Sequence, residues 1–292
     1  MNHFTIKDIE NLSGIKAHTL RIWEQRYRLF VPKRKESKHR YYDNEDLKHI
    51  LRISQLYHNG VKISKIARLS DENIRSMAME RVEEQQSKST YIHKLIEAAI
   101  DFNEDDFEIL LDKAFKHFGF ESTIIDIVYL FLERVGLLWL TDHMIPAQEH
   151  FASNIVRRKI IAHIEQLKIS PVASPHNYVL FTLEGEYHEI PLLLSHYLMK
   201  ASGKRCTYMG VDLPFSDLKA YVSHKKPSHL YFHAITNLTE DSVDKMVADI
   251  SQLFAEQQII MAGPLTKDVT QQHKNVRVLY SLKEMLEFTK DL

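Results

Sequence analysis

The chain has 292 residues, of which 44% are hydrophobic and 26% charged, and its formal net charge is −1. This length predicts two or three domains, and this composition excludes collagen-like chains and long disordered tails. A single cysteine, Cys206, excludes a disulfide framework and a thiolate metal cluster. The most apolar stretch, 124–140, contains three charged residues, and the N-terminus is charged where a signal peptide needs an apolar run. We therefore expect a cytoplasmic protein with no membrane span.

The charge is divided unevenly along the chain. Residues 1–70 contain 15 Lys/Arg and 7 Asp/Glu and carry +8, whereas residues 71–292 contain 23 and 32 and carry −9. A basic head on an acidic body indicates a nucleic-acid partner for the head alone. The alternative is a basic face that is merely solvated, and the motifs within the head have to distinguish it from a DNA-binding surface.

The first elements predict a helix-turn-helix. Thr5 to Asp8 resembles a capping box, with Asp in place of Glu or Gln, and apolar residues follow at helical spacing. Gly14 predicts a tight turn before a second helix over 16–26, whose buried face carries Leu20 and Trp23. The early residues of such a second helix meet base edges in the major groove. The predicted base-reading residues are Lys16, His18 and Thr19.

A basic loop over 32–42 follows and predicts a hairpin wing. Each Lys or Arg of a wing can neutralise a phosphate and release counterions. The order of residues resembles the MerR-family winged helix-turn-helix over about the first 70 residues. The matching positions are Thr19, Leu20, Arg21, Trp23, Arg26, Pro32, Arg34, Arg40, Tyr42 and Leu47. The DNA contacts expected beside the base-reading residues are Arg21, Arg34, Lys38, Arg40 and Tyr42, although Trp23 and Tyr42 are expected to pack in the core as well.

The middle of the chain predicts a helical bundle. Residues 76–90 are predicted as a polar helix that frays into a linker. Apolar residues at helical spacing then predict four helices, at 91–101, 104–118, 121–140 and 146–168. No sustained heptad follows residue 75, so we expect dimerisation to use other surfaces than a coiled coil.

The last third of the chain predicts a parallel sheet. Short apolar runs at 178–183, 206–209, 229–234, 258–262 and 276–280 predict strands, and the segments near 188–202, 214–225, 240–255, 266–273 and 281–290 predict helices. This alternation is typical of a parallel sheet with helices on both faces. Gly185, Gly210 and Gly263 are each expected just after a strand, at the edge where such sheets bind ligands, although ordinary turn chemistry explains any one of them.

Two short motifs in the body carry candidate chemistry. Trp139 is followed after nine residues by Glu149 and His150, at the ends of two helices that are expected to be antiparallel neighbours. Glu186 and His188 follow the first predicted strand directly, so His188 can offer an imidazole nitrogen to a metal while Glu186 orients the ring. Each residue also has an ordinary explanation, because a helical Trp usually packs in a core and a loop His is usually solvated.

Taken together, the body resembles the cobalamin-binding module, a four-helix cap followed by a doubly wound domain. That family's motif is Asp/Glu-x-His-x-x-Gly, and the resemblance implies that His188 is the lower axial cobalt ligand. The spacing from Trp139 to Glu149 and His150 resembles the CarH/LitR photoreceptors, which join a MerR-type head to this module. In that family adenosylcobalamin promotes tetramer formation and operator binding, and light reverses both. The resemblance implies cobalamin as cofactor and His150 as an upper cobalt ligand after illumination.

The sequence departs from the family pattern at three places. Pro191 replaces the motif's glycine, and proline is tolerated only in the first turn of the following helix. The serine usual on the third strand is replaced, with Thr236 as the candidate hydroxyl donor. The later Gly-Gly reads Ala262-Gly263, so Gly263 is the expected point of close approach for the nucleotide tail.

The predicted fold is multidomain, α and α/β. It comprises a winged helix-turn-helix at 1–75, a linker at 76–90, a four-helix bundle cap at 91–172 and a Rossmann-like, flavodoxin-type five-stranded domain at 176–292. The predicted function is a DNA-binding transcriptional repressor that binds an operator as a homo-oligomer, dimer or tetramer, under the control of adenosylcobalamin and light, and not an enzyme. The alternatives are a regulator whose cofactor-free body binds a protein partner and a component of a cobalamin-dependent methyltransferase.

Overall fold

The structure is a computed structural model that describes residues 2–34, 40–84, 87–140, 145–168, 176–236 and 242–291, without the side chains of 79–84 and 137–140. The chain forms two compact units, residues 1–156 and 157–292, each described by itself. In the described part of the chain, no helix combines the length and the apolar character that crossing a membrane requires.

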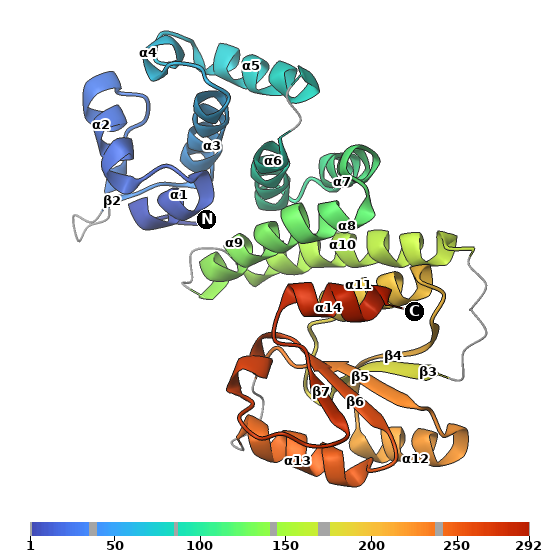
Figure 1. Cartoon of the computed structure of the whole chain (residues 1–292). Helices are drawn as coiled ribbons and strands as arrows, with labels where there is room; N and C mark the ends of the chain where they lie inside the picture. The colour runs from blue at the N-terminus through green and yellow to red at the C-terminus, as the bar shows by residue number, and fades with distance from the viewer. Residues whose placement is uncertain are drawn as a thin grey trace. The chain divides into compact units, whose positions relative to one another are not determined.

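The first unit begins with the predicted head, which we define as residues 2–84 (Figure 1). Its elements are α1 (Ile6–Ser13), α2 (Ala17–Tyr27), β1 (Lys33–Arg34), β2 (Arg40–Tyr41), α3 (Asn44–His58), α4 (Ile63–Ile66) and α5 (Asp71–Glu84). The predicted capping box is confirmed, because the Thr5 hydroxyl accepts from the Asp8 amide and the Asp8 carboxylate accepts from the Thr5 amide. The two short strands pair antiparallel and form the wing hairpin.

A helical bundle completes the first unit. Its elements are α6 (Lys88–Ile100), α7 (Glu104–Phe118), α8 (Phe120–Thr123), a π-helical turn (Ile124–Val128), α9 (Tyr129–Leu140) and α10 (Pro146–Gln166), whose last turns belong to the second unit. Its core contains edge-to-face aromatic pairs, with ring centroids of Phe107 and Phe131 5.5 Å apart and those of Phe107 and Phe151 6.1 Å apart. The four predicted helices are thus present, the third interrupted by the π-turn.

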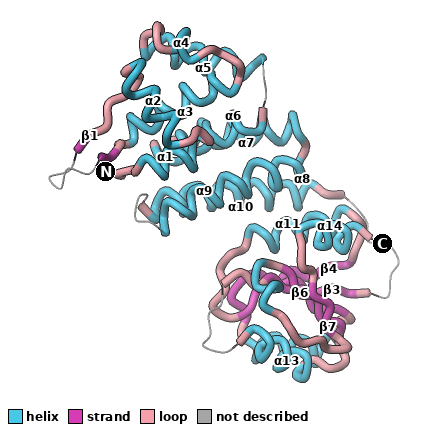
Figure 2. The backbone as a smooth tube through the Cα atoms, turned by 60° about the vertical axis from the view of Figure 1, so that its left-hand side comes forward, coloured by secondary structure: helices cyan, strands magenta, loops and turns pink. Residues whose placement is uncertain are grey.

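The second unit is a parallel sheet with the order β4-β3-β5-β6-β7 in its described residues. The strands are β3 (Asn177–Leu183), β4 (Arg205–Leu213), β5 (His229–His233), β6 (Gln258–Ala262) and β7 (Val276–Val278). The helices are α11 (Ile190–Ala201), α12 (Phe215–Lys225), α13 (Val243–Leu253) and α14 (Leu282–Lys290), with a 3₁₀ turn η2 (Pro264–Asp268). Helices α11 and α14 cover one face of the sheet, and α12 and α13 cover the other (Figures 1 and 2).

This strand order is the flavodoxin-type order that the sequence predicts, and it places the site. The second strand, β4, lies on one side of β3, and the third, β5, lies on the other side. The carboxyl ends of β3 and β5 therefore form the switch point where open α/β sheets bind ligands. Alternate residues of β3 and β5, including Val179, Phe181 and Phe232, pack beneath α12 and α13 in a buried core.

Three expected details of the fold are wrong. The helix predicted over 266–273 is the shorter 3₁₀ turn η2, which begins after Gly263, a glycine with φ +109°, and ends at Asp268. Gly210 lies inside β4 and not after it, because this strand continues to Leu213 through an irregular register. The segment 76–90, predicted as a polar helix that frays into a linker, is helical to Glu84 as expected, but α6 begins at Lys88, inside the predicted linker, and not at residue 91.

Candidate nucleic-acid interface and cofactor site

The turn between α1 and α2 is built by two residues. Gly14 has φ +73°, the left-handed region that glycine adopts without strain, and its N–H donates to Glu10 O. The Glu10 carboxylate then accepts from the Ala17 N–H (3.1 Å) and pairs with Lys16 (3.0 Å). An acid here stabilises the positive end of α2, whose own N-cap residue offers no capping side chain. The sequence analysis missed this role of Glu10.

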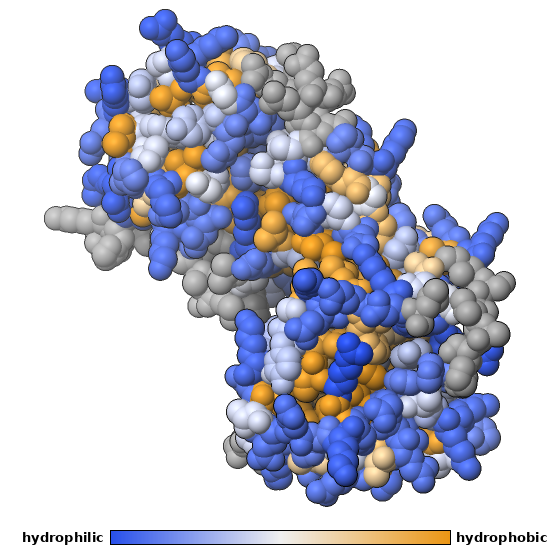
Figure 3. Space-filling model, in the orientation of Figure 1, coloured by the Kyte–Doolittle hydropathy of each residue, from blue (hydrophilic) through white to orange (hydrophobic). Residues whose placement is uncertain are grey.

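Helix α2 presents the predicted reading residues outward. Leu20 and Trp23 are buried, whereas Lys16, His18 and Arg21 are exposed and Thr19 is half-buried. The Thr19 hydroxyl lies 3.3 Å from His18 Nε2. Hydrophilic side chains cover most of the drawn face of the head, and hydrophobic ones reach its surface only in small patches (Figure 3). The residues that the sequence assigns to base reading therefore share one solvent-accessible helix.

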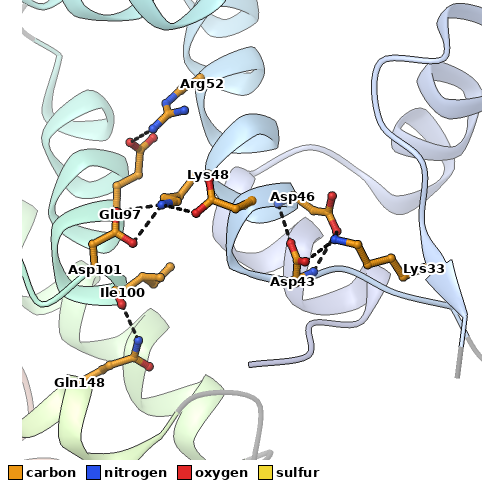
Figure 4. Close-up of polar contacts among 10 residues, drawn as sticks. Lys33, Asp43, Asp46, Lys48, Arg52, Glu97, Ile100, Asp101 and Gln148 are labelled. Carbon is orange, nitrogen blue, oxygen red and sulfur yellow. Dashed lines mark hydrogen bonds and ion pairs between the residues drawn. The ribbon is translucent and has the colours of Figure 1, made fainter. Parts of the chain in front are cut away.

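The wing is fixed to α3 by a lysine. Lys33 Nζ donates to the Asp43 carboxylate and to Asp46 Oδ2, the latter at 3.0 Å, and these two acids form the capping box of α3 (Figure 4). Arg34 is exposed on β1. Arg40, also exposed, lies 3.9 Å from the Glu24 carboxylate on α2. Lys33 thus holds strand β1 against α3, and Arg34 lies on the same strand.

Of the two roles expected for Tyr42, DNA contact and packing in the core, the structure shows only the second. Tyr42 is fully buried, and its backbone pairs with Phe4, so it belongs to the core and does not reach the surface. Burial and the negative charge of the nearby Glu24 carboxylate together raise the pKa of the Tyr42 phenol to about 12. The prediction for Lys38 lies outside the described residues.

A buried carboxylate organises the switch point of the second unit. Glu186 follows β3 and is 2% exposed. Its Oε1 lies 2.6 Å from His188 Nδ1 and accepts from the His188 N–H, and its Oε2 accepts from the Thr236 N–H (2.8 Å) and hydroxyl (2.9 Å). The Ile235 N–H also donates to Oε2. One side chain therefore joins the ends of β3 and β5.

These hydrogen bonds set the charge of Glu186. Burial alone raises its pKa, but the bonds from His188 and Thr236 outweigh burial and lower the pKa to about 2. The carboxylate is therefore ionised near neutral pH. It holds Nδ1 of a histidine ring whose side chain is 58% exposed, so a metal bound by this ring would be ligated through Nε2.

The loop that carries Glu186 and His188 is held by residues that the sequence analysis missed. Asp212, at the end of β4, accepts from the Gly185 N–H (2.7 Å) and from the Tyr187 hydroxyl (3.1 Å). Glu189 accepts from the Tyr208 hydroxyl (2.9 Å) and pairs with Arg157 of α10. No spacing in the sequence indicates these contacts, because they join elements that are distant along the chain.

The three departures from the family pattern have structural outcomes. Pro191 lies in the first turn of α11, where the expected tolerance for proline is confirmed. The Thr236 hydroxyl donates to Glu186, so it acts on the histidine through the carboxylate. A Cβ on Gly263 would lie 2.4 Å from Ala234 O, so the glycine is required where the end of β6 meets the end of β5.

The cap motif is described only in part. Trp139 lies in α9, but its side chain is outside the described residues. Glu149 and His150 lie in the first turn of α10, as predicted, and His150 Nδ1 is 3.5 Å from Glu149 Oε2. His150 is exposed. Among the described side chains, no three His, Cys, Asp or Glu residues gather as a metal site, so a metal at His188 or His150 would need other ligands, such as a macrocycle.

Comparison with known proteins agrees with both parts of the chain. Residues 4–73 match the family described as MerR HTH family regulatory protein, and residues 91–163 match the B12 binding domain. The HTH-type transcriptional repressor CarH of Myxococcus xanthus is 22% identical over 255 residues, 85% of this chain and 84% of that protein. The repressor CarA of the same organism is 23% identical over 260 residues, 88% and 85% of the two chains. The chain joins a MerR HTH domain to a B12-binding domain and is homologous to CarH and CarA.

A solved structure supports the fold of the body. The monomethylamine corrinoid protein of Methanosarcina barkeri aligns with a TM-score of 0.51 and 14% identity, over 70% of this chain and 99% of that protein. At this identity the likeness establishes the architecture alone. The predicted combination of a helix-turn-helix head, a helical bundle and a Rossmann-like domain is confirmed.

Proposed function

We propose that the protein is a transcriptional repressor whose binding to duplex DNA responds to cobalamin. The observation that carries the proposal is the Glu186–His188 pair at the switch point, in a chain whose head is a MerR helix-turn-helix. The homologues are named as repressors and not as enzymes, which agrees with the expectation of no catalytic activity.

The residues at the switch point fit a cobalamin. An imidazole is a suitable axial ligand for cobalt, and His188 offers one at the edge of the sheet. The ionised Glu186 holds Nδ1 of the ring and fixes its orientation, and Thr236 fixes Glu186 in turn. A bound macrocycle would supply the other donors to the cobalt, so a single protein ligand at His188 is enough for this site.

The finer proposal concerns the form of the cofactor and the signal. Adenosylcobalamin, when bound, would supply a cobalt–carbon bond that light can break. We assign Trp139, Glu149 and His150 to the upper face of the cofactor and Gly263 to the path of its nucleotide tail. A change at the upper face would alter the cap, and the cap would set whether the chain assembles as a dimer or tetramer. Assembly would bring several basic heads to one operator and raise DNA affinity by avidity.

The test is the absorbance of the purified protein together with its affinity for duplex DNA. We expect the protein to become red or pink after incubation with cobalamin and dialysis, and the dissociation constant for operator DNA to change with the cofactor. A colourless protein that binds DNA equally well with and without cobalamin would contradict the proposal and favour a body that binds a protein partner.

A further inference from the structure

The head and the bundle meet along a polar seam inside the first unit. We define the seam by six residues whose side chains meet there, which are Asn2, Lys48 and Arg52 of the head and Glu97, Asp101 and Gln148 of the bundle. Beside the seam, Arg134 of α9 donates to Leu12 O of α1 (3.0 Å). Figure 4 shows most of these contacts. The seam lies on the side of α3 that faces α6, away from the outward residues of α2.

Two ion pairs cross the seam. Lys48 Nζ lies 2.9 Å from both carboxylate oxygens of Asp101, and it also pairs with Glu45 of its own helix. Arg52 pairs with Glu97 at 3.0 Å. Partial burial raises the pKa of Glu97 even against the effect of Arg52, although 20% of the Glu97 side chain is exposed. Asp101 is exposed and the Arg52–Glu97 pair is half-buried, so these pairs add little net stability, and they mark where the head meets the bundle.

Gln148 connects this seam to the cap motif. Its Oε1 accepts from Asn2 Nδ2 (2.9 Å), and its Nε2 donates to Ile100 O at the end of α6 (2.7 Å). Gln148 is 2% exposed and Asn2 is 7% exposed, so both bonds are shielded from water. Gln148 directly precedes Glu149 and His150 in the first turn of α10.

The other end of the connection lies at the wing. Two residues after Asn2, Phe4 exchanges both backbone hydrogen bonds with Tyr42, at 2.8 and 2.9 Å. Tyr42 directly follows the wing strand β2 (Arg40–Tyr41). A single chain of contacts therefore runs from the first turn of α10, through Gln148 and Asn2, to the base of the wing.

We propose that Gln148 is a positioning residue that couples the first turn of α10 to the DNA-binding wing. The inference rests on the proposed function, in which that turn lies over the cofactor. If the turn moves, Gln148 must stretch or release Asn2 or Ile100, and a buried polar group left unpaired is costly. The cap and the wing are then not independent, and a ligand that favours one position of the cap favours one position of the wing.

The test compares Gln148→Leu with Gln166→Leu. Both substitutions are on α10, but Gln166 is exposed and lies outside the seam. Operator affinity is measured with and without cobalamin, and cobalamin affinity is measured with and without operator. We expect Gln148→Leu to reduce the ratio of the two operator affinities by about 2- to 13-fold, the range for one hydrogen bond present in only one of two states. Because the two binding events are linked reciprocally, the ratio of cobalamin affinities measured with and without operator should fall by the same factor. Gln166→Leu should leave both ratios unchanged.

A second measurement is independent of the cofactor. In the protein without cobalamin, amide hydrogen exchange at Phe4 and Tyr42 should be faster in Gln148→Leu than in wild type or Gln166→Leu. Asn2→Ala, which removes the other partner, should reproduce this change if Gln148→Leu folds poorly. Unchanged exchange at both amides would overturn the inference. If the DNA affinity of the wild-type protein is the same with and without cobalamin, the proposed function is overturned. Faster amide exchange in Gln148→Leu would still support the connection between Gln148 and the wing.

Discussion

At the scale of single residues, the Glu186 carboxylate is held by five polar contacts. Three backbone amides, one hydroxyl and one imidazole nitrogen surround its two oxygens. A buried carboxylate with so many donors stays ionised, because hydrogen bonds to the charged form outweigh the loss of hydration. The residue is therefore a fixed negative charge behind His188, and it ties the ends of two strands together.

The first prediction is a pH dependence that disappears in Glu186→Gln. The folded pKa of Glu186 is about 2 and its ordinary value is 4.5. Its contribution to the free energy of unfolding is thus fully present above about pH 4.5 and is lost as the pH falls toward 2. Denaturant titrations should show wild type losing its advantage over Glu186→Gln across this window.

The exposed neighbour Glu184 provides the control, since Glu184→Gln should keep the pH dependence of wild type. Parallel curves for wild type and Glu186→Gln between pH 5 and pH 2 would contradict the assigned pKa.

The second prediction concerns the axial ligand. His188→Ala should lower cobalamin affinity at least about 10-fold, since changing even an outer partner of a metal ligand typically costs about 10- to 100-fold. The visible spectrum of the bound cofactor should shift from an imidazole-ligated to a weakly ligated form. Equilibrium dialysis and absorbance measure both effects. The exposed His224 on α12 supplies the matched control, and a His188→Ala spectrum equal to that of His224→Ala would assign the ligand elsewhere.

At the scale of elements, the wing shows how one basic hairpin divides its roles. Lys33 is bonded to the capping box of α3, whereas Arg34 and Arg40 are exposed on the two strands. A basic run in the sequence does not distinguish a cation that supports the fold from one that meets a phosphate. The strand pairing and the helix cap make that distinction here, because they place Lys33 against two carboxylates.

The third prediction separates these two roles by salt dependence. Arg40→Ala should weaken binding to all duplex sequences and reduce the slope of log affinity against log salt by about one, as expected for one lost phosphate contact. Lys33→Met should keep the slope and lower the free energy of unfolding, because it leaves Asp43 and Asp46 without their cation. His18→Ala should instead change base preference.

Fluorescence anisotropy with operator and random duplexes, at several salt concentrations, distinguishes the three variants. An unchanged slope in Arg40→Ala would remove this residue from the DNA contacts, and a reduced slope in Lys33→Met would place Lys33 among them.

At the scale of the whole molecule, the chain contains a DNA-binding head and a cofactor-binding body in one polypeptide. The described boundary between the two compact units falls inside α10, the helix whose first turn carries Glu149 and His150. Helix α10 of the cap therefore contributes residues to both compact units.

The fourth prediction is a change in assembly. With adenosylcobalamin in darkness, the protein should sediment as an oligomer of two or four chains, and illumination should lower its mass. Cofactor-free protein should match the illuminated sample, since a ligand shifts assembly only through its differential affinity for the two states. Analytical ultracentrifugation tests this, with methylcobalamin and hydroxocobalamin as controls for the upper ligand. A mass that is indifferent to cofactor and light would remove the photoswitch and leave the DNA-binding head in place.

The sequence by itself determined the features that arise from local interactions. The capping box at Thr5 and Asp8, the left-handed turn at Gly14 and the alternation of strands and helices after residue 176 all follow from neighbouring residues. The order Glu186, Tyr187, His188 after an apolar strand likewise predicted which residues would stand at the edge of the sheet, because a parallel sheet brings the carboxyl ends of its strands together.

Only the tertiary structure decided which groups those residues meet. Thr236 meets Glu186 across 50 positions of sequence, Lys33 bonds to a helix cap, and Gln148 joins Asn2 across 146 positions. Tyr42 was expected both in the core and at the DNA, and it lies in the core alone, whereas Gly210 was expected after a strand and lies within β4. Such pairings leave no periodic signal, since they depend on how separate elements pack and not on the spacing of residues within one element.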